Sequence, residues 1–96
     1  MTTWFVSRHP GALEWIRQEE VAFDIHVPHL DISHITAGDV VIGTLPIHLA
    51  AEVHARGASY VHLELHVPSH MRGQEISAEQ LRVLGGALRP YRVEKL

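Results

Sequence analysis

Two short stretches of the sequence place an arginine close to a histidine, a combination that suits phosphate chemistry. Arg8 precedes His9 directly, and His70 and Arg72 lie together in the stretch 68–73. The planar guanidinium of arginine can bind two phosphate oxygens at once, and histidine can transfer a proton near neutral pH. A third stretch, residues 43–46, offers the hydroxyl of Thr44 and backbone N–H groups at a helix start. Together the three stretches predict a site for an oxyanion or a phosphate.

Each of these residues also has a simpler structural explanation. Ser7 and Thr44 could serve only as helix caps, and the two arginines could be ordinary surface residues. A metal site is a further alternative, built from four side chains that could supply nitrogen and oxygen ligands: His26, His29, Asp31 and His34. Their spacing fits no standard zinc motif, which favours the anion site.

The elements that must position these stretches follow from hydrophobic patterning and from helix-start signals. Apolar, β-branched runs predict strands, while Pro10, Pro46 and the capping-box pair Ser77 and Gln80 predict helix starts. The predicted strands cover residues 3–7, 21–27, 40–42, 59–67 and 91–93. The predicted helices run from residue 10 to about 20, from 46 to 57 and from 77 to 88. Residues 28–37 are predicted to form a crossing loop with one short helical turn.

This order of elements predicts one α/β domain over residues 1–96, a small three-layer Rossmann-like fold with a mostly parallel sheet of about five strands. The alternation of apolar and polar residues in 21–27 favours an edge position for that strand. Patterning leaves the direction of the last strand open. Ligands of such sheets bind where strands end and helices begin, so the three stretches are expected to meet in one cleft.

Composition narrows the class of partner. The chain carries a net charge of −3 with histidine neutral, and protonation of all nine histidines would bring it to +6. A negative net charge argues against non-specific binding of long nucleic acid.

No apolar run approaches the length that spans a bilayer, there is no cysteine, and the first residues lack a signal-peptide layout, so a cytoplasmic protein is expected. A chain of 96 residues has little room for a private cleft, which favours a site shared between subunits.

Five stretches of the sequence together resemble a known family. They are residues 3–12 (TWFVSRHPGA), 29–31 (HLD), 38–46 (GDVVIGTLP), 49–53 (LAAEV) and 72–73 (RG). Their combination resembles the Csx sixteen family of small proteins that accompany type III CRISPR systems. The resemblance extends from the first predicted strand to the last predicted helix.

The resemblance implies a Rossmann-type domain that binds cyclic oligoadenylate and acts as a ring nuclease. Such enzymes cleave cyclic tetra-adenylate and so switch off type III CRISPR signalling. They work without a metal or other cofactor, usually as homodimers with the ring on the two-fold axis. The products expected here are linear di-adenylates ending in a 2′,3′-cyclic phosphate. A non-catalytic module that sequesters the same messenger remains an alternative, as does a structural partner of a CRISPR effector.

The chemistry of this reaction suggests a role for each candidate residue. Arg8 and Arg72 would stabilise charge at the phosphate, and His9 would donate the proton to the leaving 5′-oxygen. The remaining candidates would bind substrate: Ser7, Thr44, Leu45 through its backbone N–H, Asp31 and His70. The stretch from Gly38 to Ala51 would provide the scaffold and the backbone-donor wall of the cleft.

Overall fold

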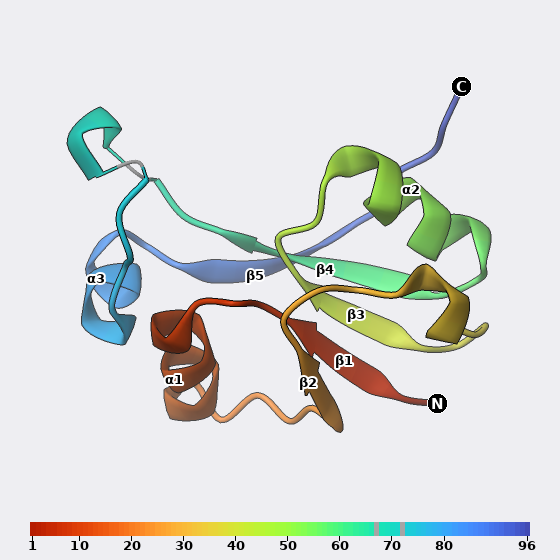
Figure 1. Cartoon of the computed structure of the whole chain (residues 1–96), viewed down its shortest axis with the longest axis horizontal. Coiled ribbons are helices and arrows are strands. Elements are labelled where there is room, and N and C mark those ends of the chain that lie inside the picture. The colour runs from red at the N-terminus through yellow and green to blue at the C-terminus, as the bar shows by residue number, and fades with distance from the viewer. Residues whose placement is uncertain (67, 72) are drawn as a thin grey trace.

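The protein is built on one five-stranded sheet with the strand order β2-β1-β3-β4-β5 (Figure 1). A computed structural model describes residues 1–66, 68–71 and 73–96. The strands are β1 (Thr3–Val6), β2 (Ile25–Val27), β3 (Val40–Gly43), β4 (Ser59–Glu64) and β5 (Ala87–Tyr91). The first four strands are parallel to one another, and β5 pairs with β4 in the antiparallel sense. The predicted α/β class and the mostly parallel sheet are confirmed.

Helices cover both faces of the sheet and make three layers. On one face α1 (Pro10–Gln18) and α3 (Ala78–Val83) enclose a core that includes Phe5 and Ile16. On the other face α2 (Ile47–Ala55) and the short 3₁₀ helix η1 (Ile32–His34) flank a core that includes Val41 and Val53. The helical turn η1 is the one predicted within residues 28–37. Among the residues that the structure describes, no helix is long and apolar enough to cross a membrane.

Local sequence signals account for the start and end of the helices. Pro10 occupies the first turn of α1, where its missing N–H has no helical partner. The Ser77 hydroxyl accepts from the Gln80 N–H at 3.1 Å and the Gln80 side chain accepts from the Ser77 N–H at 2.9 Å, which completes the predicted capping box of α3. Gly57, at a φ of 81°, takes the left-handed position after α2.

The end of the last helix and the start of the last strand were predicted wrongly. The helix was expected to reach Leu88, but α3 ends at Val83 and Leu88 lies in β5. Gly85, at a φ of 78°, turns the chain back, and the Gly86 N–H closes the turn on the Leu81 carbonyl at 2.7 Å. The strand predicted at residues 91–93 is instead Ala87–Tyr91. It contains Pro90, which an edge strand tolerates.

Two other strands are shorter than predicted by three residues or more, and β1 ends one residue before the predicted Ser7. β2 spans only Ile25–Val27, at the predicted edge of the sheet, while Val21 and Phe23 pack against the core below α1 from a loop. β4 ends at Glu64. Val67, the predicted end of that strand, lies outside the described residues. Both differences occur at the ends of strands, where patterning is least informative.

Candidate functional site

The loops that follow β1, β2, β3 and β4 meet in a cleft of about 540 Å³. The strand order 2-1-3-4-5 places a topological switch between β1 and β3, because the chain leaves these two strands in opposite directions. The cleft lies at the carboxyl ends of these strands, as the general rule for open α/β sheets requires. Its walls include residues 7–9 and residues 43–46, so two of the three predicted stretches meet there. Of the third stretch, residues 68–71 and Gly73 are not among the described residues that line the cleft, although the adjoining Gln74 is.

The first wall is the turn between β1 and α1, which is tied to the edge strand. The Ser7 N–H donates to the Val27 carbonyl at 3.0 Å, and Nε2 of His26 lies 2.8 Å from the Ser7 carbonyl. Because a carbonyl can only accept, this nitrogen of His26 must carry the proton. The Ser7 hydroxyl in turn accepts from the His9 N–H at 3.2 Å. These contacts hold the turn while the side chains of Arg8 and His9 stay exposed at the cleft.

The second wall is the turn between β3 and α2, whose polar groups are bonded to the neighbouring strand. The Thr44 hydroxyl donates to the Leu63 carbonyl at 3.3 Å, and the Leu45 N–H donates to the Tyr60 hydroxyl at 2.9 Å. Both residues line the cleft as predicted. The hydroxyl of Thr44 keeps lone pairs with which it can accept, but the Leu45 N–H already has a partner. The Leu45 N–H is therefore not free to donate to a substrate phosphate, as had been expected of this turn.

The third wall comes from the segment between β4 and α3. Gln74, Ile76 and Leu65 face the cleft, and Gly11 of α1 packs directly beneath Ile76. His70 lies in a second 3₁₀ helix, η2 (Ser69–Met71), and is not among the described residues that line the cleft. Arg72 lies outside the described residues, so its predicted catalytic role stays a prediction.

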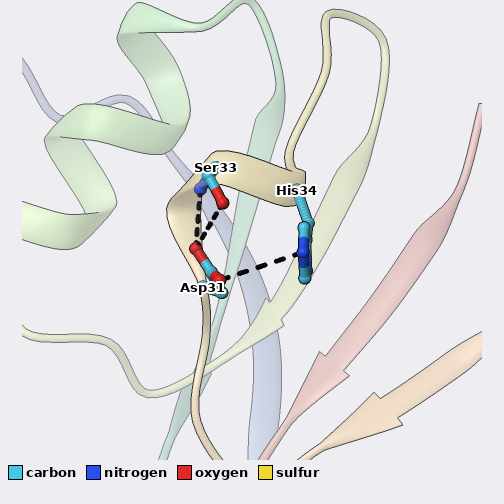
Figure 2. A network of polar contacts seen from close by, with 3 residues as sticks. All are labelled: Asp31, Ser33 and His34. Atoms are coloured by element: carbon cyan, nitrogen blue, oxygen red, sulfur yellow. Dashed lines mark hydrogen bonds and ion pairs between the residues drawn. The ribbon is translucent and has the colours of Figure 1, made fainter.

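Asp31 belongs to a local network beside the cleft. Its carboxylate caps η1 by accepting from the Ser33 N–H at 3.0 Å and from the Ser33 hydroxyl at 2.6 Å (Figure 2). Nε2 of His34 lies 3.8 Å from the same carboxylate. These Ser33 hydrogen bonds hold the pKa of Asp31 below its usual value. Asp31 is not among the described residues that line the cleft, so its position matches a capping role.

The charge of the cleft is one-sided. Arg8, His9 and His29 line it, and no described carboxylate does. Its floor is apolar and includes Leu30, Leu49 and Leu63. An apolar floor with a cationic rim suits a ligand that has both flat rings and negative charge. His29 had been considered from the sequence as a possible metal ligand and as part of the stretch 29–31 of the family resemblance, but not as a residue of the anion site.

The comparisons with known proteins place the chain in a family. Residues 4–94 match the family described as "Putative CRISPR-associated protein (Cas_VVA1548)". The chain belongs to this family. No curated protein and no solved structure matches the chain significantly. Association with CRISPR, expected from the sequence, is thereby confirmed at the level of the family.

The CRISPR-associated chain has a second hollow, of about 680 Å³, on the α2 side of β4 and β5. It shares Thr44, Leu45, Leu63 and Leu65 with the cleft, so the two hollows adjoin at the turn after β3. Polar side chains on one face of the two strands line it: Tyr60, His62, Glu64, Arg89 and Tyr91. Alternation along β4 places Tyr60, His62 and Glu64 on this face. The part that β5 contributes could not be predicted, because the last strand was expected at residues 91–93 and lies at Ala87–Tyr91.

A cluster of metal ligands is not formed within the described part of the chain. The four residues considered from the sequence have separate positions in this family member. His26 bonds to the Ser7 carbonyl, His29 lines the cleft, and Asp31 and His34 belong to the η1 network. The metal-site alternative is therefore not supported by their arrangement.

Proposed function

We propose that this protein is a ring nuclease of the Csx sixteen type, which cleaves cyclic tetra-adenylate and ends a type III CRISPR signal. The observation that carries the proposal is the cleft at the β1/β3 switch, rimmed by Arg8, His9 and His29 with no described carboxylate. Membership of a CRISPR-associated family supports the biological setting. The choice of cyclic tetra-adenylate as the messenger rests on the resemblance of the sequence to the Csx sixteen family.

The shape of the cleft suits part of a cyclic oligoadenylate. Its apolar floor can accept an adenine, and its rim can face a phosphate. At about 540 Å³ the cleft falls in the range of sites for one small molecule. A ring of four nucleotides therefore needs a second surface, which a two-fold partner would supply. We infer that the working form is a homodimer with the ring across its axis.

The reaction proposed is an internal transesterification. The ribose 2′-oxygen attacks the adjacent phosphorus, the bond to the 5′-oxygen breaks, and a 2′,3′-cyclic phosphate remains. Two such cuts give two linear di-adenylates and consume no water. Arg8 would stabilise charge on the phosphate and His9 would protonate the leaving oxygen. Ser7 and Thr44 would contact the ribose or phosphate. The substrate-binding roles of Leu45, Asp31 and His70 and the charge-stabilising role of Arg72 stay predictions from the sequence.

The same cleft could instead hold the messenger without cutting it, which is the rival function. Radiolabelled cyclic tetra-adenylate incubated with excess protein separates the two on a denaturing gel. A ring nuclease converts the label to a shorter linear product within minutes to hours. A sequestering module retards the ring on a native gel and returns it intact after denaturation. Absence of both effects would refute messenger binding and favour a structural partner of an effector.

Two further measurements test the parts of the proposal. Arg8→Ala should weaken ring binding at least tenfold, because a charge-assisted contact to phosphate is worth about 1.5–3 kcal/mol. The matched control is Arg17→Ala, which removes an exposed arginine of α1 that does not line the cleft. Equal ring binding by both variants would show that the ring does not bind at the cleft beside Arg8. Light scattering should give the mass of a dimer, and a monomer at the concentration of the assay would contradict the shared site.

A further inference from the structure

His62 lies in the second hollow and has no role so far in the proposed reaction. It lies on β4 opposite Gly43, the last residue of β3, and opposite Arg89 of β5. Its ring packs edge-on against Tyr60 and Tyr91, with ring centroids 5.6 Å away in both cases. His62 is half-buried and lines the hollow. Two aromatic walls thus fix the plane of the imidazole.

The contacts of Tyr60 determine which ring nitrogen of His62 carries the proton. The Tyr60 oxygen lies 2.9 Å from the Leu45 nitrogen, 3.1 Å from the Gly43 carbonyl oxygen and 2.6 Å from Nδ1 of His62. The Leu45 N–H can only donate, and the Gly43 carbonyl can only accept. All three contacts can therefore be hydrogen bonds at once only if the Tyr60 hydroxyl donates to Gly43 and Nδ1–H of His62 donates to the Tyr60 oxygen.

Two observations support this arrangement. Burial raises the pKa of Tyr60, so its hydroxyl keeps its proton at neutral pH and can donate to Gly43. With the proton on Nδ1, the neutral imidazole presents a bare lone pair on Nε2. Within the described residues Nε2 has no hydrogen-bond partner. A neutral imidazole with a fixed Nδ1–H and a free Nε2 is prepared to accept a proton.

Charged groups of both signs line the hollow around His62. Arg89 faces it from the directly opposed position on β5 and supplies a guanidinium that can bind phosphate. The carboxylate of Glu64 also lines the hollow and accepts from the Tyr91 hydroxyl. The turn at Thr44 and Leu45 separates this hollow from the cleft that holds His9. Two imidazoles therefore lie on opposite sides of one turn.

We propose that His62 is the general base of the ring-opening reaction and that Tyr60 is the residue that positions it. This inference rests on the proposed ring-nuclease function. Nε2 of His62 takes the proton of the 2′-OH while the 2′-oxygen bonds to phosphorus. The bond from phosphorus to the 5′-oxygen breaks, and protonated His9 supplies the proton of the new 5′-OH.

Single-turnover cleavage of cyclic tetra-adenylate by the full chain tests the assignment. His62→Gln should bind the ring within about threefold of wild type and cut it about 10²- to 10⁴-fold more slowly, the range for loss of a positioned acid or base. The control is His48→Gln, which removes an exposed histidine of α2 that lines neither hollow. Cleavage by His62→Gln within threefold of wild type would overturn the inference while leaving the ring-nuclease function intact. An uncut ring with wild-type protein would refute that function itself.

Two readouts distinguish a base from a merely structural residue. A ring with sulfur in place of the 5′-bridging oxygen has a leaving group that needs no proton, so it should rescue His9→Gln and not His62→Gln. Rescue of His62→Gln would overturn the base assignment. The ¹⁵N shifts of the free protein should show His62 with its proton on Nδ1, and Tyr60→Phe should shift that population toward Nε2–H. A wild-type imidazole found protonated on Nε2 alone would also overturn it.

Discussion

The hydroxyl of Tyr60 joins the end of β3 to β4, so its removal should destabilise the fold measurably. Tyr60 is only 4% exposed, and its hydroxyl donates to the Gly43 carbonyl at 3.1 Å and accepts from the Leu45 N–H at 2.9 Å. In Tyr60→Phe both backbone groups lose their partner. Each stranded buried group costs about 1–3 kcal/mol, but the Leu45 N–H is only partly buried and can recruit water.

We therefore expect Tyr60→Phe to lower the free energy of unfolding by about 2–3 kcal/mol. For a domain of this size that corresponds to a fall in Tm of roughly 10–20 °C. Thermal unfolding followed by circular dichroism, with urea titration as a second method, measures the change. Tyr91→Phe is the control, because Tyr91 is 48% exposed and, among the residues that the structure describes, its hydroxyl bonds to the half-buried Glu64 alone. A fall in Tm below about 2 °C for Tyr60→Phe would refute the hydrogen-bond assignment on which the His62 tautomer depends.

Three other perturbations test the frame around the cleft. Gly11→Ala places a Cβ 2.0 Å from the Ile76 carbonyl oxygen, so it should lower the free energy of unfolding by about 1–3 kcal/mol. A glycine-to-alanine change in a helix usually raises it by roughly 1 kcal/mol. Urea titration distinguishes the two outcomes. His26→Ala removes the donor to the Ser7 carbonyl and should lower the free energy of unfolding by about 1 kcal/mol. It should also weaken ring binding by up to about fivefold in a titration. Wild-type affinity would show that the turn after β1 keeps its conformation without this hydrogen bond. The backbone N–H groups of Thr36 and Thr2 hold the pKa of Asp39 below its usual 3.8, so its stabilising effect is present above that pH and lost as pH falls through the lower folded value. Acid titration should therefore show a steeper loss of stability for wild type than for Asp39→Asn, and parallel curves would contradict it.

Much of the fold follows from signals that are local in the sequence. The run Val40–Ile42, the prolines at positions 10 and 46, and the Ser77–Gln80 pair each fix an element through near neighbours. The meeting of three loops at one cleft also follows, because parallel strands end at one edge. The last helix was predicted to run from 77 to 88, and the last strand was misplaced with it, because Gly85 reverses the chain after α3. A helical stripe that continued to Leu88 concealed this turn.

The polar contacts of the site depend on strand pairing and could not be read from neighbours. Tyr60 reaches Gly43 and Leu45 only because β3 and β4 are parallel and in the observed register. The hollow around His62 exists only because β5 lies antiparallel beside β4 and brings Tyr91 to it. Such contacts join residues far apart in the sequence. Patterning therefore found the rim residues Arg8 and His9 but missed the network behind them.

The central claim is that the protein opens cyclic tetra-adenylate by internal transesterification. The most direct test incubates wild-type protein with the ring in excess EDTA and water enriched in ¹⁸O, followed by mass spectrometry. We predict linear di-adenylate with a 2′,3′-cyclic phosphate, half the mass of the ring and free of ¹⁸O, because no water is consumed. An intact ring, or a product that carries ¹⁸O from its first appearance, would contradict it.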